Sequence, residues 1–187
     1  MCRQCRVDEG KPPSDPHTYY DEFGRYRRIA LTRGLYALVD PEQYDELNAF
    51  NWTVHPSNGG MYAHRMVLDE SKRSRQRMVS MHNDVAGPGR WDHHNINPLD
   101  NRRGNLRTAD DSQNGYNKPK RNSSRCTSRY KGVSWHKKHE VWVVRITVAR
   151  KTLHLGCFPK EQEEQAARAY DAAAIEHHGE FARLNVV

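Results

Sequence analysis

Alternation of apolar and polar residues marks the first strand-rich region of the chain. Residues 26–39 alternate and are rich in β-forming side chains, so they predict a pair of strands. A short helix is predicted over 41–50, because an Asp-Pro pair opens it and proline fits the first helical position. The runs 61–68 and 77–82 also alternate, and the polar stretch between them predicts that they form a β-hairpin.

The middle of the chain and its beginning lack this regularity. The block 91–114 is dense in polar side chains and ends in a predicted helix, since Thr108 and Asp111 have the spacing of a capping box. Residues 1–25 mix Gly, Pro and Asp with little periodicity and are interpreted as a loose leader. Residues 117–128 contain Pro, Ser and several basic residues and almost nothing apolar, which is typical of a linker.

Three strand-like runs and a helix follow this basic linker. The strands are predicted at 130–135, 141–148 and 152–158. The helix is predicted over about 160–178, with acidic residues in its first turns and Gly179 as its stop. The whole chain therefore predicts an α+β fold, in which a β-rich N-terminal domain is followed by a small three-stranded antiparallel sheet packed on one helix.

Charge is distributed unevenly along the 187 residues. The formal net charge is +7; residues 1–115 contain 16 Lys and Arg against 16 Asp and Glu, whereas residues 116–187 contain 14 against 7. A basic segment of this kind indicates a polyanionic partner, since each cation near a phosphate releases condensed counterions. On charge alone, the alternative is a solvated surface of high isoelectric point.

Hydropathy, the N-terminal sequence and cysteine spacing argue against a membrane protein, a secreted protein and a zinc site. The mean hydropathy is −1.01, and no apolar run approaches the roughly 20 residues of a membrane helix. The N-terminus lacks the hydrophobic stretch of a secretory signal, so we expect a cytoplasmic protein that is not secreted and has no membrane partner. Cys2 and Cys5 have the spacing of a metal pair, but a zinc site needs two further ligands, so we expect no zinc there.

Three side chains of the middle block have the chemistry that phosphodiester hydrolysis requires. The reaction needs an activated water, a cation on the phosphate oxygens and relief of charge on the leaving oxygen. Histidine titrates near neutral pH, which makes His93 a candidate general base. Asp92 and the amide oxygen of Asn114 are hard oxygen donors suited to Mg²⁺ or Mn²⁺.

The same block resembles a known family. The run Asp-His-His-Asn-Ile-Asn-Pro-Leu-Asp-Asn-Arg-Arg-Gly-Asn-Leu-Arg at 92–107, followed by Ser-Gln-Asn at 112–114, is similar to the pattern of HNH homing endonucleases of the His-Me finger superfamily. The resemblance implies a ββα-metal (HNH) core in a nuclease domain over 26–116. It implies the following roles: Asp92 and Asn114 as metal ligands, His93 as general base, Asn105 as a brace of the loop that orients the histidine, His82 as the first histidine of the motif, and Arg102, Arg103 and Arg107 as cations on the phosphate side.

The C-terminal segment resembles a second family. Arg-Tyr-Lys-Gly-Val-Ser-Trp at 129–135, His-Leu-Gly-Cys-Phe at 154–158 and an Ala-rich run at 166–174 are similar to the Apetala-type, or ethylene-response-factor-type, DNA-binding domain, here over 129–187. The resemblance implies a sheet that lies in the major groove of DNA. Its DNA face would comprise Lys131, Ser134, His136, Arg145, Thr147, Thr152 and His154. Trp135 is either a base contact or an aromatic of the core or edge.

Together the two resemblances predict a site-specific, divalent-metal-dependent homing-type endonuclease that acts as a monomer on double-stranded DNA, in a phage, bacterial or organellar setting. The alternative is a non-cleaving DNA-binding regulator with a degenerate HNH core. A nuclease acting on RNA is less favoured, because a sheet-type reader suits the wide major groove of B-form DNA.

Overall fold

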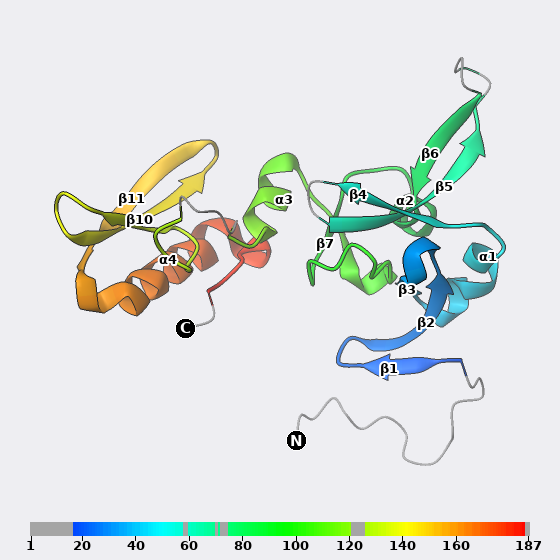
Figure 1. Cartoon of the computed structure of the whole chain (residues 1–187), viewed down its shortest axis with the longest axis horizontal. Coiled ribbons are helices and arrows are strands. Elements are labelled where there is room, and N and C mark those ends of the chain that lie inside the picture. Colours follow the sequence, from blue (N-terminus) through cyan, green and yellow to red (C-terminus); the bar gives the residue numbers. More distant parts are fainter. Residues whose placement is uncertain (1–16, 58–59, 70, 72–74, 121–125, 186–187) are drawn as a thin grey trace, which may run out of the picture. The chain divides into compact units, whose positions relative to one another are not determined.

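The computed structural model describes residues 17–57, 60–69, 71, 75–120 and 126–185, and it divides into two compact units (Figure 1). The N-terminal unit comprises Met1–Gly89 and Asn97–Leu106, and the C-terminal unit comprises Arg90–Ile96 and Arg107–Val187. Cys2 and Cys5 lie outside the described residues. Within the described ranges, no helix has both the length and the apolar character needed to cross a membrane.

The N-terminal unit is built from two antiparallel sheets and short helices. The first sheet has the order β1-β2-β3, with strands at Tyr19–Asp21, Gly24–Ala30 and Tyr36–Val39. The second has the order β4-β5-β6, with strands at Thr53–Ser57, Gly60–Leu68 and Gln76–Ser80. The helical segments are η1 at Thr32–Gly34, η2 at Pro41–Gln43, α1 at Tyr44–Asn48, α2 at Met81–Ala86 and η3 at Arg103–Asn105.

One apolar core joins these elements. Ile29 from β2, Val39 from β3 and Met81 from α2 are each no more than 2% exposed and pack in the same cluster. Trp52 belongs to this cluster as well, and its indole N–H donates to the carbonyl of Leu47 at 2.7 Å, which satisfies the polar atom of a buried ring.

The predicted strand pair of residues 26–39 and the predicted hairpin are confirmed, with three differences. The strand β1 lies inside the predicted leader, and β4 was not predicted. The run 77–82 does not stay extended to its end, because β6 stops at Ser80 and the fully buried Met81 starts helix α2. His82 therefore lies on a helix and not on a strand.

The C-terminal unit opens with two short strands and a helix. These elements are β7 at Trp91–His93, β8 at Leu106–Thr108, whose first residue belongs to the N-terminal unit, and α3 at Asp111–Asn117. The predicted helix exists, but its capping box is formed by Asp110 and Gln113 instead of Thr108 and Asp111. The Asp110 carboxylate accepts from the backbone N–H groups of Ser112 and Gln113 at 2.7 and 2.8 Å, so it satisfies donors that the helix itself leaves open.

A three-stranded antiparallel sheet packed on one helix makes up the rest of the unit, as the sequence predicts (Figure 1). The strands are β9 at Val133–His136, β10 at Val141–Val148 and β11 at Lys151–Pro159, in the order β11-β10-β9. The helix α4 at Glu163–His178 follows η4 at Lys160–Gln162 and ends just before Gly179, where η5 at Gly179–Phe181 begins. Its small alanines allow close approach to the sheet. The buried ones are Ala166, Ala167, Ala173 and Ala174.

The first residues of the predicted linker are ordered against this sheet. Asn117 is the last residue of α3 and is buried. The ammonium group of Lys120 donates to the carbonyls of Tyr130 and Val133 at 2.6 and 2.9 Å. The structure thus assigns residues 107–120 to the C-terminal unit, because side chains of this segment bond to the sheet.

Candidate nucleic-acid interface

The sheet of the C-terminal unit has two chemically different faces. Val144 and Ile146 of β10 are buried against α4, whereas the alternating Arg145 and Thr147 are exposed on the opposite face. Cross-strand partners follow the same alternation, since Arg145 lies opposite His154 and Thr147 lies opposite Thr152.

β9 extends this outward face. Ser134 and His136 lie opposite Val143 and Val141 of β10 and are both exposed. Six of the seven residues predicted for the DNA face therefore share the side of the sheet that points away from α4. Whether they contact DNA stays a prediction.

Lys131 is the seventh residue, and its position is different. It comes before β9 and is only partly exposed, and its ammonium group donates to the carbonyls of Tyr116 and Lys118 at 2.5 and 2.7 Å. Burial, together with the nearby charge of Arg183, lowers the pKa of Lys131 to about 8.

Trp135 lies on the other side of the sheet. It is opposite Trp142, which shares the inward face with Val144, and the two indole rings meet edge to face with centroids 4.8 Å apart. Of the two roles left open for Trp135, the geometry fits an aromatic at the edge of the core.

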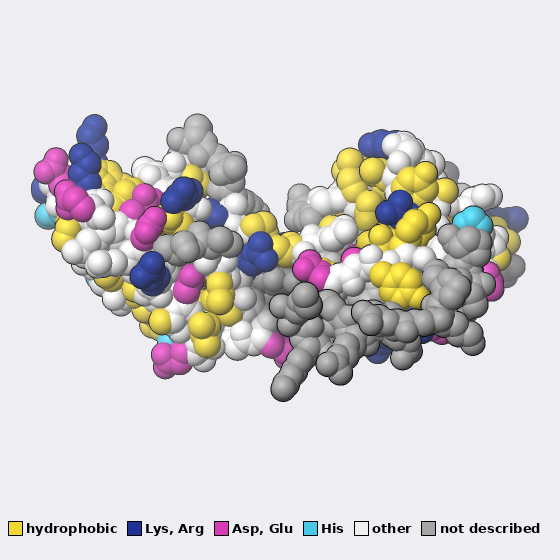
Figure 2. Space-filling model, turned by 90° about the horizontal axis from the view of Figure 1, so that it is seen from below, with side chains coloured by type: hydrophobic (Ala, Val, Ile, Leu, Met, Phe, Trp, Pro, Cys, Tyr) yellow, Lys and Arg dark blue, Asp and Glu magenta, His cyan; other side chains and the backbone are white. Residues whose placement is uncertain are grey.

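The sheet layer and the helix layer of the C-terminal unit differ in net charge. Residues 129–158, which contain the strands, have seven Lys and Arg against a single Glu. Residues 159–185, which contain α4, have three Lys and Arg against six Asp and Glu. Figure 2 views the molecule from below Figure 1, on the side where α4 lies, and there acidic side chains stand among the basic ones. A polyanion is therefore attracted more strongly to the sheet layer, with its turns, than to the layer of α4.

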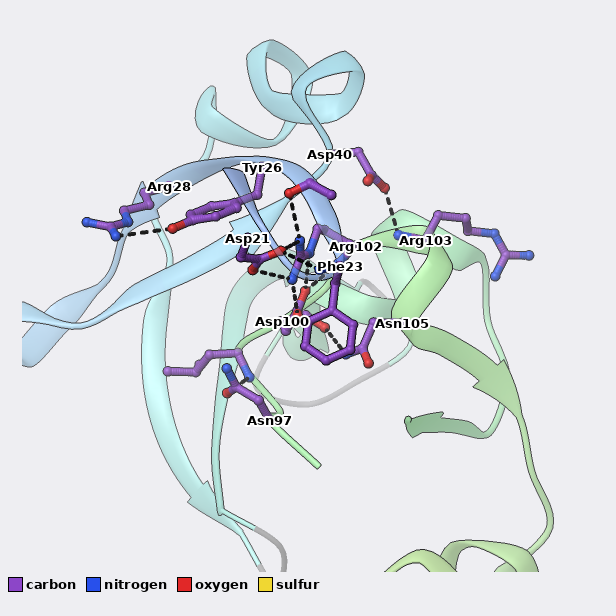
Figure 3. A network of polar contacts seen from close by, with 12 residues as sticks. Asp21, Phe23, Tyr26, Arg28, Asp40, Asn97, Asp100, Arg102, Arg103 and Asn105 are labelled. Carbon is purple, nitrogen blue, oxygen red and sulfur yellow. Dashed lines mark hydrogen bonds and ion pairs between the residues drawn. The ribbon is translucent and has the colours of Figure 1, made fainter. Parts of the chain in front are cut away.

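Arg102 is not available as a phosphate contact, in contrast to the expectation. Its side chain is 4% exposed and forms ion pairs with Asp21 at 2.7 Å and with Asp100 at 2.6 Å (Figure 3). Burial alone would raise the pKa of Asp21, but the hydrogen bonds from Arg102 and from the Phe23 backbone outweigh it and hold that pKa below its ordinary value. The guanidinium thus joins the turn between β1 and β2 to the loop around Asp100.

The same loop is bonded to strand β3, and a bond between Asn105 and Asp100 closes the loop on itself (Figure 3). The backbone N–H of Asn101 donates to the carbonyl of Leu38 at 2.8 Å, and the Asn105 amide donates to the carbonyl of Asp100 at 2.7 Å. Asn105 therefore braces the loop of residues 100–105. Arg103 keeps an exposed side chain, while its backbone N–H donates to the Asp40 carboxylate at 2.7 Å.

The buried Asp92 forms an ion pair with the partly buried Arg107. Oδ2 of Asp92 accepts from Nε and Nη2 of Arg107 at 2.9 and 2.8 Å. The Arg107 guanidinium also donates to the carbonyl of Glu180 at 2.6 Å and lies 3.9 Å from the ring centre of Phe181. Arg107 consequently anchors β8 to the segment after α4, which leaves it unsuited to the predicted phosphate contact.

Asn117 completes this cluster, and sequence reasoning missed it. Its amide donates to Asp92 at 3.0 Å and to the carbonyl of His93 at 3.0 Å. The predicted metal ligand, Asn114, lies one helical turn earlier on α3, so the spacing of three residues was the signal that could have pointed to Asn117. His93 itself is 6% exposed on β7.

The donor set around Asp92 does not fit a divalent cation in this arrangement, because a guanidinium already neutralises the carboxylate. Nor do the described residues contain any group of three or more His, Cys, Asp or Glu placed to hold a metal ion. The predicted catalytic residues are also divided between the units, with His82 and Asn105 in the N-terminal unit and Asp92, His93 and Asn114 in the C-terminal unit.

A three-stranded sheet packed on one helix agrees with an AP2-like DNA-binding domain, and comparison with known proteins supports this class. No protein-family model matches the chain. Over 58 residues, 30% of this chain and 10% of the relative, it is 47% identical to the AP2-like ethylene-responsive transcription factor PLT2 of Arabidopsis thaliana. It is 45% identical over 58 residues to the AP2-like ethylene-responsive transcription factor CRL5 of Oryza sativa subsp. japonica, 30% of this chain and 9% of the relative. It is 42% identical over 64 residues to the ethylene-responsive transcription factor WRI1 of Arabidopsis thaliana, 33% of this chain and 14% of the relative. The chain thus spans about a tenth of the length of these curated relatives.

These comparisons overturn the expectation of a homing-type endonuclease. The curated proteins that match are named as transcription factors and not as nucleases. The prediction of a hydrolase with an HNH core is therefore wrong, and the likeness to an AP2-like domain is the part of the prediction that the comparisons support.

Proposed function

We propose that this protein is a DNA-binding regulator that does not cut its target. The identity of 42–47% to transcription factors over about the length of the sheet-and-helix segment is the observation that carries the proposal. Because these relatives are transcription factors, we propose that this chain acts on double-stranded DNA. We further propose that it does so as a monomer.

The outward face of the sheet supplies the chemistry for this function. Arg145 and His154 are opposite each other on neighbouring strands and offer N–H donors to phosphates or base edges. Thr147 and Thr152 place two hydroxyl groups beside them, 3.5 Å apart. A row of short polar side chains flanked by cations suits a groove in which the sheet must come close to the bases.

The buried state of Asp92 supports a non-cleaving role. The Asp92 carboxylate is bonded to Arg107 and Asn117, so it stabilises the contact of β7, β8 and α3. In this state it does not serve as a ligand of a catalytic cation. In this proposal residues 92–107, which resemble the HNH pattern, have a structural role and no catalytic one.

Selection of binding sites from a random double-stranded DNA library, with the full chain, tests the proposal. We expect enrichment of a short motif and an affinity that falls steeply with salt, because counterions are released on binding. Plasmid DNA that contains the selected motif should stay intact with Mg²⁺ as well as with EDTA. Failure to enrich any motif, or metal-dependent cutting of the plasmid, would contradict the proposal.

A further inference from the structure

A cavity of about 410 Å³ lies in the C-terminal unit, along the half of β10 that β9 does not pair with. β9 pairs only with Val141–Val144. Beyond that point, other groups bond to the open edge of β10: the His178 ring to the carbonyl of Thr147 at 3.0 Å, and the Tyr116 hydroxyl to the N–H of Ala149 at 3.3 Å. The cavity is thus bounded by α3, by the end of α4 and by the edge of the sheet.

The polar wall of the cavity is basic. Lys131, Arg145 and Arg150 line it, and none of the described lining residues is acidic. Lys131 bonds to two backbone carbonyls at the end of α3, which leaves one of its three N–H donors for another acceptor. In the part of the chain that the structure describes, neither Arg145 nor Arg150 forms an ion pair. This concentration of unmatched positive charge favours an anion.

The remaining wall of the cavity is aromatic. The rings of Tyr116 and His178 stack at 3.6 Å with planes 6° apart, and Tyr170 closes another side. His178 is 7% exposed, and its Nε2 bonds to the Thr147 carbonyl at 3.0 Å, so the stacked rings form a fixed flat surface against which a planar base can lie.

We infer that this cavity binds a nucleoside monophosphate, with the phosphate on Lys131, Arg145 and Arg150 and the flat base against the aromatic wall. The volume is in the range of small-ligand sites, which combine apolar walls with a few placed polar groups. The aromatic wall is formed by residues of α3 and α4 at the sheet edge, and the volume of about 410 Å³ suits a single small ligand, so a free nucleotide fits the cavity better than the backbone of double-stranded DNA.

A nucleotide in this cavity also lowers the affinity for DNA, and this effect rests on the proposed function. Arg145 and Thr147 line the cavity and also belong to the proposed DNA face. A bound nucleotide therefore competes with DNA for the same cations, and DNA affinity falls as nucleotide is added.

Calorimetric titration of the full chain without DNA tests the site. The probes are the four 5′-ribonucleoside monophosphates, the four matching nucleosides and inorganic phosphate. We expect saturable binding of at least one monophosphate, and at least tenfold weaker binding of its nucleoside and of inorganic phosphate.

Two variants and one control locate the site. Arg150→Asn removes one cation and suits the positive φ of 65° at this turn, and it should weaken nucleotide binding at least tenfold. Gly115→Leu adds bulk at the cavity wall from α3 and should have a similar effect. Lys151→Gln changes the neighbouring exposed cation, which does not line the cavity, and should leave binding unchanged.

The inference is overturned if none of the four monophosphates saturates, if inorganic phosphate binds as tightly as they do, or if Arg150→Asn behaves like Lys151→Gln. Circular dichroism of each variant shows whether it folds. Because the titration contains no DNA, nucleotide binding can be observed even if the chain fails to select a DNA motif, and the two proposals fail separately.

Discussion

At the scale of single residues, two adjacent arginines have opposite environments. Arg102 is buried between the carboxylates of Asp100 and Asp21, whereas the side chain of Arg103 is exposed. Sequence alone gives both the same role as phosphate cations. The difference arises from the loop bonds to Leu38, which turn one guanidinium into the unit and the next one out of it.

Replacing these two arginines in turn tests this assignment. Arg102→Ala should reduce the free energy of unfolding by about 3–5 kcal/mol, because it leaves the fully buried Asp100 without its cation. Arg103→Ala should change it by less than about 0.5 kcal/mol, as an exposed substitution does. Urea denaturation of the full chain measures both values, and equal effects would contradict the assignment.

Gly132 occupies the tightest position in the C-terminal unit. Its φ is +78°, and a Cβ there would overlap the ring of Tyr170. Gly132→Ala should therefore destabilise this unit by roughly 2–4 kcal/mol through strain and overpacking.

A second glycine of the same unit is the control. Gly115 lies in α3 with open space at its Cβ position, so Gly115→Ala should be neutral or should stabilise by up to about 1 kcal/mol. A thermal midpoint of Gly132→Ala within one degree of that of the unchanged protein would exclude the proposed overlap.

At the scale of elements, the end of α4 joins α3 to the sheet. His178 stacks on Tyr116 and bonds to Thr147, and burial lowers its pKa below the ordinary value, with a smaller contribution from the charges of Lys131 and His177. The folded state therefore binds fewer protons at this site than the unfolded state.

This linkage predicts acid sensitivity at one histidine. The contribution of His178 to stability is fully present above pH 6.5, the ordinary pKa of histidine, and is lost as the pH falls below it. His178→Phe keeps the ring stack without the titration. Urea midpoints measured from pH 7 to pH 5 should fall less in this variant than in the unchanged protein, and parallel curves would contradict the linkage.

Long alternating runs made most elements predictable. The three strands of the C-terminal sheet and α4 follow their sequence patterns closely, because each covers four residues or more and keeps one apolar face. The three-residue strands β1 and β7 are too short to show an alternating pattern, and they depend on partners elsewhere in the chain.

The outward face of the C-terminal sheet was also predictable, because alternation along each strand separates outward from inward side chains. The roles of Arg102, Arg107 and Asn117 were not, since they depend on contacts between segments far apart in the sequence.

At the scale of the whole molecule, charge separates more sharply than the division of the sequence indicates. The excess of cations in residues 116–187 lies in residues 116–158, which contain the strands, the turns between them and the segment before them, whereas residues 159–185, which contain α4, are acidic. A polyanion is therefore attracted more strongly to the sheet layer than to α4, and the outward face of the sheet carries Arg145 and His154.

The most direct test of this account compares two exposed arginines, Arg145 on the sheet and Arg168 on α4, in DNA binding by the full chain. With a duplex that contains the selected motif, Arg145→Ala should weaken binding by tenfold or more and lower the salt slope by about 0.9, the share of one phosphate contact in B-form DNA. Arg168→Ala should leave the affinity within twofold of that of the unchanged protein and should not change the salt slope. If Arg168→Ala weakens binding as much as Arg145→Ala, the sheet is not the surface that reads DNA.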